Sequence, residues 1–217
     1  MAKEDPPQLD PRQGRDAPDI PALILAAGAA RRMQGTDKLL EKVRGVPLLR
    51  AKVEDALACG MAAYVTLPGP EHPRWNLLDG LPVTRVPVPN AHRGMAASLG
   101  AGLHALPPRA RRVMILLADL PELSAAHLRT MLDAAKAHPD APALRGATED
   151  GRAGHPVILS LTFKDQLLGL EGDRGAGAIL KTLPVVKITL PGTVAITDLD
   201  TPEDWAAWRA AQREQGH

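Results

Sequence analysis

Residues 22–40 read ALILAAGAARRMQGTDKLL, and this stretch joins a short apolar run to a glycine turn and several cations. The run at 22–27 has the length and composition of a buried strand, and Gly28 ends it. Small residues around the glycine leave the backbone N–H groups open to an anion. Because Arg32 and Lys38 add positive charge, the stretch predicts a triphosphate-binding turn. The alternative is a structural glycine turn followed by a solvated basic face.

Two common nucleotide motifs are absent from this sequence. It contains no GxxxxGK[ST], and no GxGxxG opens a helix after a strand. The turn at Gly28 is therefore not predicted to be a kinase-like P-loop or a dinucleotide site.

Outward from this stretch, strand and helix patterns alternate along the chain. Further strands are predicted at 63–67, 81–88, 113–118, 142–148, 155–161, 185–190 and 194–197. Helices are predicted from Pro47 to Gly60, at 95–106, from Ser124, at 162–170, at 175–182 and from Pro202. This α/β alternation predicts a mostly parallel sheet covered on both faces, with a ligand at the carboxyl ends of the strands.

Two acidic motifs lie where such a ligand is expected. Asp119 directly follows the apolar run at 113–118, a position that suits a ligand of a hard metal, although a loop-capping role is the alternative. In ITDLDTPEDW at 196–205, Asp198 and Asp200 would point the same way if the backbone is extended. The alternative for this motif is a helix start, with Thr201 as the N-cap.

Composition excludes several classes of protein. With 217 residues, 45% hydrophobic and 24% charged, the chain has ordinary globular values. A net charge of +1 and 2% aromatic residues argue against binding of nucleic acid. No apolar run approaches a membrane helix, and the first residues lack the apolar block of a signal peptide, so a cytoplasmic protein without a membrane partner is expected. Residues 1–19 are expected to form a disordered tail, and 20–217 a single domain.

Six blocks of the sequence resemble, in the same order, the MobA-like nucleotidyltransferases, and within them the molybdenum cofactor cytidylyltransferases. The blocks are LAAG…RM…DK at 25–38, GMAASLGAGL at 94–103, LLADLP at 116–121, GHPVIL at 154–159, GDRGAGAIL at 172–180 and DLDTPEDW at 198–205. The resemblance implies a Rossmann-like, three-layer α/β/α nucleotidyltransferase fold, shared with GT-A glycosyltransferases.

The resemblance also implies roles for individual residues. Arg32, Lys38 and Asp119 would be catalytic, and Mg²⁺ would be held by Asp119 with Asp200, or with Asp198 in its place. Residues that would contact the nucleotide are Leu25, Ala26, Ala27, Gly28, Ala29, Arg32, Lys38, Gly94, Ser98 and Asp119. Residues that would contact the acceptor are Gly154, His155, Pro156, Gly172 and Asp173.

The implied reaction moves CMP from CTP to the terminal phosphate of molybdopterin and releases pyrophosphate. A phosphate nucleophile is ionised at neutral pH, so positioning and charge neutralisation can carry the catalysis. LAAG at 25–28 resembles the CTP-using branch, and the Ala27 methyl would leave less room for a purine. One alternative is another NTP or another phosphorylated acceptor. The other is a non-catalytic carrier that delivers molybdenum cofactor to a molybdoenzyme.

Overall fold

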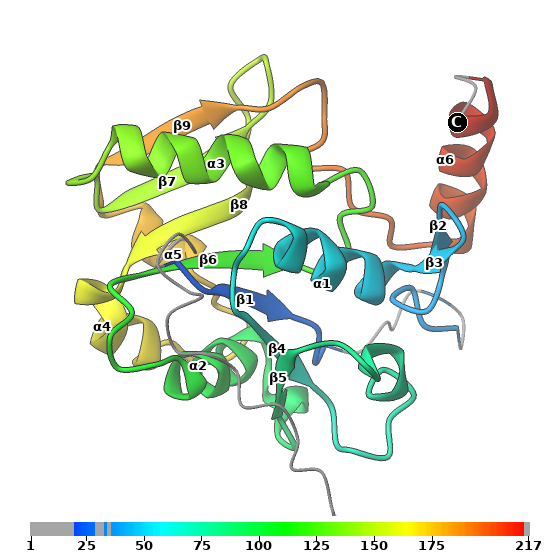
Figure 1. The fold of residues 1–217 in the computed structure, drawn as a ribbon, viewed down its shortest axis with the longest axis horizontal. Helices are drawn as coiled ribbons and strands as arrows, with labels where there is room; N and C mark the ends of the chain where they lie inside the picture. The colour runs from blue at the N-terminus through cyan, green and yellow to red at the C-terminus, as the bar shows by residue number, and fades with distance from the viewer. Residues whose placement is uncertain (1–19, 29–32, 34–35, 215–217) are drawn as a thin grey trace, which may run out of the picture.

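The computed structural model describes residues 20–28, 33 and 36–214, and within them seven strands form one sheet (Figure 1). The strands, in sheet order, are β5 (Val83–Pro87), β4 (Ala63–Leu67), β1 (Ala22–Leu25), β6 (Arg112–Leu117), β8 (Ala153–Ser160), β7 (Ala143–Ala147) and β9 (Val185–Thr189). Strand β8 runs antiparallel to β6 and β7, and the other pairs are parallel. The prediction of a mostly parallel sheet is confirmed.

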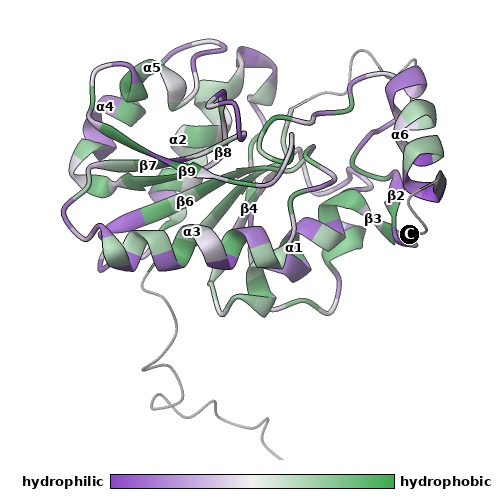
Figure 2. Ribbon diagram, turned by 90° about the horizontal axis from the view of Figure 1, so that it is seen from above, coloured by the Kyte–Doolittle hydropathy of each residue, from purple (hydrophilic) through white to green (hydrophobic). Residues whose placement is uncertain are grey.

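Helices cover both faces of this sheet (Figure 2). One face carries α1 (Leu48–Ala58) and α3 (Ala125–Ala137), and the other carries α2 (Met95–Ala105), α4 (Lys164–Leu168) and α5 (Gly177–Leu180). The last helix, α6 (Pro202–Glu214), stands beside a short ribbon of β2 (Lys42–Val43) and β3 (Val46–Pro47). Single 3-10 turns lie at Asn76–Leu78, Ala91–Arg93 and Leu161–Phe163. The three-layer α/β/α architecture is therefore confirmed.

The apolar runs in the sequence become strands because the sheet buries both of their faces. In β1, Ala22 and Ile24 join the core cluster under α1 and α3, while Leu23 joins the cluster under α2 and α4. In β6, Met114 and Ile115 divide in the same way. A strand buried on both sides reads as a continuous apolar run, because neither face needs polar side chains.

The connectivity places a topological switch point, hereafter called the crevice, at the carboxyl ends of β1 and β6. From β1 the chain moves to β4 and β5 on one side of the sheet, and then returns to β6 on the other side of β1. Open α/β sheets bind their ligands at such a switch of direction. The turn after β1 and the turn after β6 therefore face the same crevice.

The structure differs from the predicted elements at residues 194–197 and at the β2–β3 ribbon. Residues 194–197 form a turn instead of a strand, since Ile196 N and Thr197 N both donate to Thr193 O. The β2–β3 ribbon was not predicted. The expected tail at 1–19 lies outside the described residues, and its disorder remains a prediction. Within the described residues no helix has the length and apolarity needed to cross a membrane.

Candidate active site

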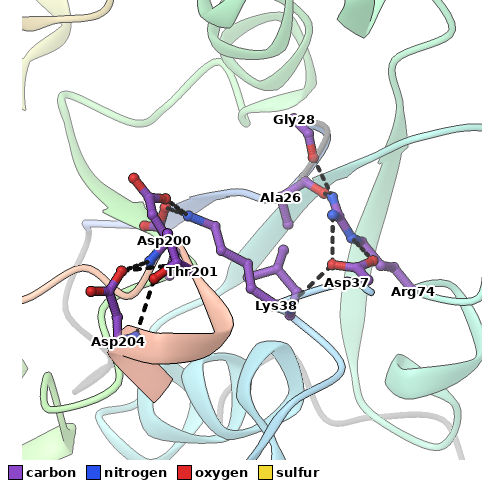
Figure 3. A network of polar contacts seen from close by, with 10 residues as sticks. Ala26, Gly28, Asp37, Lys38, Arg74, Asp200, Thr201 and Asp204 are labelled. Atoms are coloured by element: carbon purple, nitrogen blue, oxygen red, sulfur yellow. Dashed lines mark hydrogen bonds and ion pairs between the residues drawn. The ribbon is translucent and has the colours of Figure 1, made fainter. Parts of the chain in front are cut away.

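Lys38 stands at the centre of the crevice, between two acidic side chains that come from distant parts of the chain (Figure 3). Its Nζ lies 2.7 Å from Asp119 Oδ2 and 2.7 Å from Asp200 Oδ1. Asp119 follows β6, and Asp200 precedes α6. The structure thus brings together three residues that the sequence predicted to share one site.

The two carboxylates keep Lys38 positively charged. Burial by itself opposes the ammonium, but the charges and hydrogen bonds of Asp119 and Asp200 outweigh it, so the pKa of Lys38 is raised above its ordinary value of 10.5. The Lys38 side chain is 14% exposed, so water screens this cation only in part. A fixed positive charge at the crevice suits a polyphosphate.

The donor set also fits a divalent metal. Asp119 Oδ1 is buried and has no hydrogen-bond partner among the described residues. An unpaired buried carboxylate oxygen is costly, and a hard cation would satisfy it. No group of three or more potential ligands gathers within the described part of the chain. Mg²⁺ often takes one or two carboxylates and completes its shell with substrate phosphates, so the pair of acids is sufficient.

The motif at 196–205 forms the predicted helix start, and the metal-binding roles of Asp198 and Asp200 remain predictions. Thr201 and Asp204 form a reciprocal cap at the start of α6, with Thr201 N donating to Asp204 Oδ2 at 2.9 Å and Asp204 N donating to Thr201 Oγ1 at 3.1 Å. The residue just before this cap is Asp200, which reaches Lys38, whereas Asp198 is exposed. The helix cap therefore fixes the carboxylate that enters the site.

The glycine turn is held from below by Arg74, a residue that the sequence analysis missed (Figure 3). Its Nη1 donates to Ala26 O at 2.6 Å and to Gly28 O at 2.7 Å. Its Nε and Nη2 donate to the two carboxylate oxygens of Asp37 at 2.7 and 2.8 Å. No motif marked Arg74, because its partners lie 37 to 48 positions away in the sequence. Ala29 and Arg32 lie outside the described residues, and their roles remain predictions.

The residues assigned to the nucleotide and to the acceptor loop meet at the start of α2. Gly94 has φ +108°, and a Cβ there would lie 2.3 Å from Gly172 O, so only glycine fits. Ala96 N donates to Gly172 O at 3.0 Å. Ser98 is buried one turn further into α2, at 4% exposure, while Asp173 is exposed. The loop at 172–173 is thus held against the start of α2 by the hydrogen bond from Ala96 N and by the close packing of Gly94 on Gly172.

The remaining acceptor residues lie on β8, and only one of them lines a cavity. A Cβ on Gly154 would meet Ala195 O at 2.0 Å, and Pro156 is buried; the roles of both residues toward the acceptor remain predictions. His155 borders a cavity of about 60 Å³ together with Arg145, another residue missed from sequence. Burial, and then the Arg145 charge, lower the pKa of His155 to about 4, so its ring is neutral at pH 7. The Nδ1 atom of His155 is buried without a partner among the described residues.

Fold and site together define a class of proteins: α/β nucleotidyltransferases with a glycine turn, a lysine and paired acids at one sheet edge. Comparison of sequences agrees, because the MobA-like NTP transferase domain matches residues 22–187. The chain therefore belongs to the MobA-like NTP transferase family, so the predicted resemblance to this family is confirmed, while the cytidylyltransferase branch remains a prediction.

Two curated relatives span nearly the whole chain. It is 27% identical to the purine catabolism protein PucB of Bacillus subtilis, over 90% of this chain and 98% of PucB. It is 30% identical to a probable molybdenum cofactor guanylyltransferase of Synechococcus elongatus, over 86% of this chain and 96% of the relative. Among solved structures, Rv0371c of Mycobacterium tuberculosis shares 30% identity with a TM-score of 0.76, over 87% of this chain and 95% of that one. A further structure of that protein is described as a complex with manganese.

Proposed function

We propose that this chain is a metal-dependent cytidylyltransferase, which moves CMP from CTP to the terminal phosphate of molybdopterin and releases pyrophosphate. The observation that carries the proposal is the position of Lys38 between Asp119 and Asp200, beside the glycine turn. Family membership supports nucleotidyl transfer, and the name of the Synechococcus relative supports a molybdopterin-type acceptor. A carrier protein would have no need of this arrangement of charges.

The chemistry uses charge and position. An oxygen of the acceptor phosphate attacks the α-phosphorus of CTP, the bond to the β-phosphate breaks, and pyrophosphate carries away the electron pair. The attacking oxygen is already ionised at pH 7, so no residue has to remove a proton. Lys38 neutralises charge on the phosphates, and the backbone at Gly28 orients them. When bound by Asp119 and Asp200, a divalent metal supplies further neutralisation of the triphosphate and of the leaving pyrophosphate.

The acceptor is proposed to approach over β8, where His155 and Arg145 border the small cavity. Arg145 Nε donates to Gly154 O at 2.9 Å, and burial lowers the pKa of this arginine while leaving it charged at pH 7. A cation beside a neutral imidazole suits an acceptor that is anionic at one end and bears polar nitrogens or oxygens at the other.

The preference for CTP rests on Ala27. This residue is only 4% exposed, and the carbonyls on either side of it, at Ala26 and Gly28, are both bound by Arg74. The turn therefore cannot shift easily to make room for a larger base above the Ala27 methyl. Such steric discrimination is worth roughly 10–200-fold. Guanylyl transfer is the second candidate, because the Synechococcus relative bears the name guanylyltransferase.

Competition among nucleotides tests the proposal. The protein is incubated with molybdopterin, a divalent metal and equal CTP, GTP, ATP and UTP, and the nucleotide in the product and the released pyrophosphate are measured. We expect CMP to dominate, and Ala27→Gly to narrow the ratio of CTP to GTP. A preference for GTP in the wild type would contradict the cytidylyl assignment and favour the second candidate. Pyrophosphate release only with a different phosphorylated acceptor would contradict molybdopterin.

A further inference from the structure

Arg74 is almost completely enclosed, although it lies in the loop between β4 and β5. It is 2% exposed, and four of its N–H···O contacts go to protein acceptors: both oxygens of Asp37 and the carbonyls of Ala26 and Gly28. Its charge is matched by Asp37, with Nε 2.7 Å from Oδ2. A guanidinium committed in this way has almost no donor left for a phosphate, so Arg74 does not contact the substrate itself.

The contacts of Arg74 join the two ends of the phosphate-binding turn. On one side it holds the backbone where β1 ends, at Ala26 and Gly28. On the other side it holds Asp37, whose Oδ1 also accepts from Leu39 N at 3.0 Å, and whose carbonyl accepts from Leu40 N at 2.9 Å. These bonds shape the short turn at 37–40 from which Lys38 projects toward Asp119.

The loop that carries Arg74 is itself fixed. Trp75 Nε1 donates to Pro68 O at 2.8 Å, and Trp75 N donates to His72 O at 3.0 Å. The guanidinium carbon of Arg85 lies over the Trp75 ring, 5.9 Å from its centroid, in a cation–π contact. The loop therefore holds Arg74 in place. Arg74 in turn holds the glycine turn through a bidentate ion pair with Asp37 and through contacts with the carbonyls of Ala26 and Gly28.

We propose that Arg74 is a positioning residue for nucleotidyl transfer, which sets the distance and orientation between the glycine turn and Lys38 by clamping Gly28 and Asp37 to one guanidinium. The inference rests on the proposed function, since the turn and Lys38 are the proposed triphosphate site. Loss of the clamp would let the two halves of that site move apart. Misplacement of a catalytic group by about 1 Å can cost about 10²-fold in rate.

The test compares variants at Arg74 with a matched arginine. Arg112 also binds backbone carbonyls, with Nη1 donating to Ala135 O at 3.0 Å and Nη2 donating to Ala141 O at 2.7 Å, but it begins β6, at the end of the strand opposite to Asp119. We measure kcat and KM for the NTP, and NTP binding by calorimetry, at a temperature where every variant is folded. Arg74→Met should lower kcat/KM about 10²-fold, whereas Arg112→Met should stay within about twofold.

Two further variants separate positioning from charge and from folding. Arg74→Lys should restore little activity, because a point charge cannot make the bidentate pair and both carbonyl contacts. In an Asp37→Asn background, Arg74→Met should cost much less than in the wild type, because the two residues act on one path. Because Arg74→Lys keeps the charge and most of the volume of the side chain, it keeps the test informative if Arg74→Met does not fold.

Several results would overturn the inference. Full activity of Arg74→Lys would show that only the positive charge of Arg74 matters, and that its bidentate geometry does not. Equal losses of kcat/KM in the Arg74 and Arg112 variants, or independent losses at Arg74 and Asp37, would show that Arg74 contributes only to stability. If the wild type and Arg74→Met both bind NTP and turn it over equally well, the inference about Arg74 is overturned and the proposed function stands. A wild-type protein that neither binds nor turns over any NTP would overturn the proposed function together with it.

Discussion

Lys38 does two things at once in the proposed active site. Its ammonium compensates the negative charges of Asp119 and Asp200, and it occupies the space between them, with Nζ 2.7 Å from an oxygen of each. Without this cation, two acids on one crevice would repel each other. The same acids are the proposed metal ligands, so lysine and metal compete for one pair of carboxylates.

Replacement of Lys38 by methionine separates these two roles. Lys38→Met should bind Mn²⁺ more tightly than the wild type when no nucleotide is present, because the competing cation is gone. The same variant should lose about 10²-fold or more in turnover, since one charge-stabilising group is missing. Metal binding is measured by calorimetry or by the Mn²⁺ spin-resonance signal, and turnover by pyrophosphate release.

Asp119→Asn is the comparison for this prediction. It removes a proposed ligand and should weaken both Mn²⁺ binding and turnover. Weaker Mn²⁺ binding by Lys38→Met than by the wild type would contradict competition, and would show that Lys38 instead organises the two acids for the metal.

The sequence predicts site residues that lie directly after strands or before helices. It does not predict site residues whose partners lie far away in the sequence. Lys38, Asp119 and Asp200 lie at predicted element ends, so topology alone could bring them together. Arg74 and Arg145 could not be found in this way. Each is a single arginine in a segment without a motif. Arg74 binds the carbonyls of Ala26 and Gly28, and Arg145 binds the carbonyl of Gly154 and shares a cavity with His155.

The elements themselves were predicted best where a buried face imposes a pattern. Strand β4 at Ala63–Leu67 has the predicted bounds, because both of its faces are packed. The error at 194–197 has a physical cause. Apolar residues there imitate a strand, but Ala195 is buried against Gly154 and accepts a hydrogen bond from His155 N. The segment fills a gap beside β8 instead of extending the sheet.

Helix α1 carries an unusual charge that gives a prediction on stability. Lys52 is buried, and its Nζ lies 3.5 Å from Asp55 Oδ2 without a hydrogen-bond partner among the described residues. Burial lowers the pKa of Lys52 to about 8, against the opposing effect of Asp55 and with a smaller contribution from Arg44. The unfolded chain therefore binds more protons between pH 8 and 10.5, and the free energy of unfolding rises with pH in that window.

Lys52→Met combined with Asp55→Asn should raise the free energy of unfolding at pH 7 on the order of 1–2 kcal/mol, because both charges of a buried pair are removed together, whereas Lys52→Met alone would leave the buried Oδ2 of Asp55 without its cation. In a domain of this size each kcal/mol corresponds to about 2–4 °C in Tm. The gain should shrink as the pH rises from 8 toward 10.5, where the wild-type lysine becomes neutral. Thermal unfolding at several pH values measures it.

Lys136→Met on α3 is the matched control, since this lysine is exposed and pairs with Asp133 at 2.9 Å. Its Tm relative to the wild type should stay nearly constant over the same pH range. A gain at Lys52 that did not change with pH would mean that packing, rather than the buried charge, is responsible.

On the scale of the whole molecule, the site is completed by a part of the chain beyond the family match. That match ends at residue 187, whereas Asp200 and α6 follow it. Helix α6 is fixed to the rest of the protein by the buried Trp205, by Trp208 Nε1 donating to Glu122 Oε1 at 3.1 Å, and by an ion pair between Arg209 and Glu41. Figure 1 shows this helix beside the β2–β3 ribbon, at the end of the sheet to which β1 and β6 point.

The overall architecture was predictable because alternating elements admit few arrangements. A mostly parallel sheet and a site at its carboxyl edge follow from the order of strands and helices. The antiparallel direction of β8 and the docking of α6 do not, because both depend on contacts between segments that share no local pattern. The choice of base and acceptor depends on side chains facing a ligand, and the sequence constrains these least.

Trp205 tests whether docking of α6 sets the metal site. Trp205 is 1% exposed, so Trp205→Ala should lower the free energy of unfolding by about 3–5 kcal/mol. Because Asp200 is held at the start of the same helix, this variant should also bind Mn²⁺ more weakly and lose kcat/KM at temperatures where it remains folded. Leu103→Ala is the control, since Leu103 is fully buried in the cluster on the opposite face of the sheet. It should cost about 2–5 kcal/mol but leave Mn²⁺ affinity unchanged. If both variants lost metal affinity in proportion to their stability, general loosening of the fold would explain the effect, and α6 would have no special part in placing Asp200.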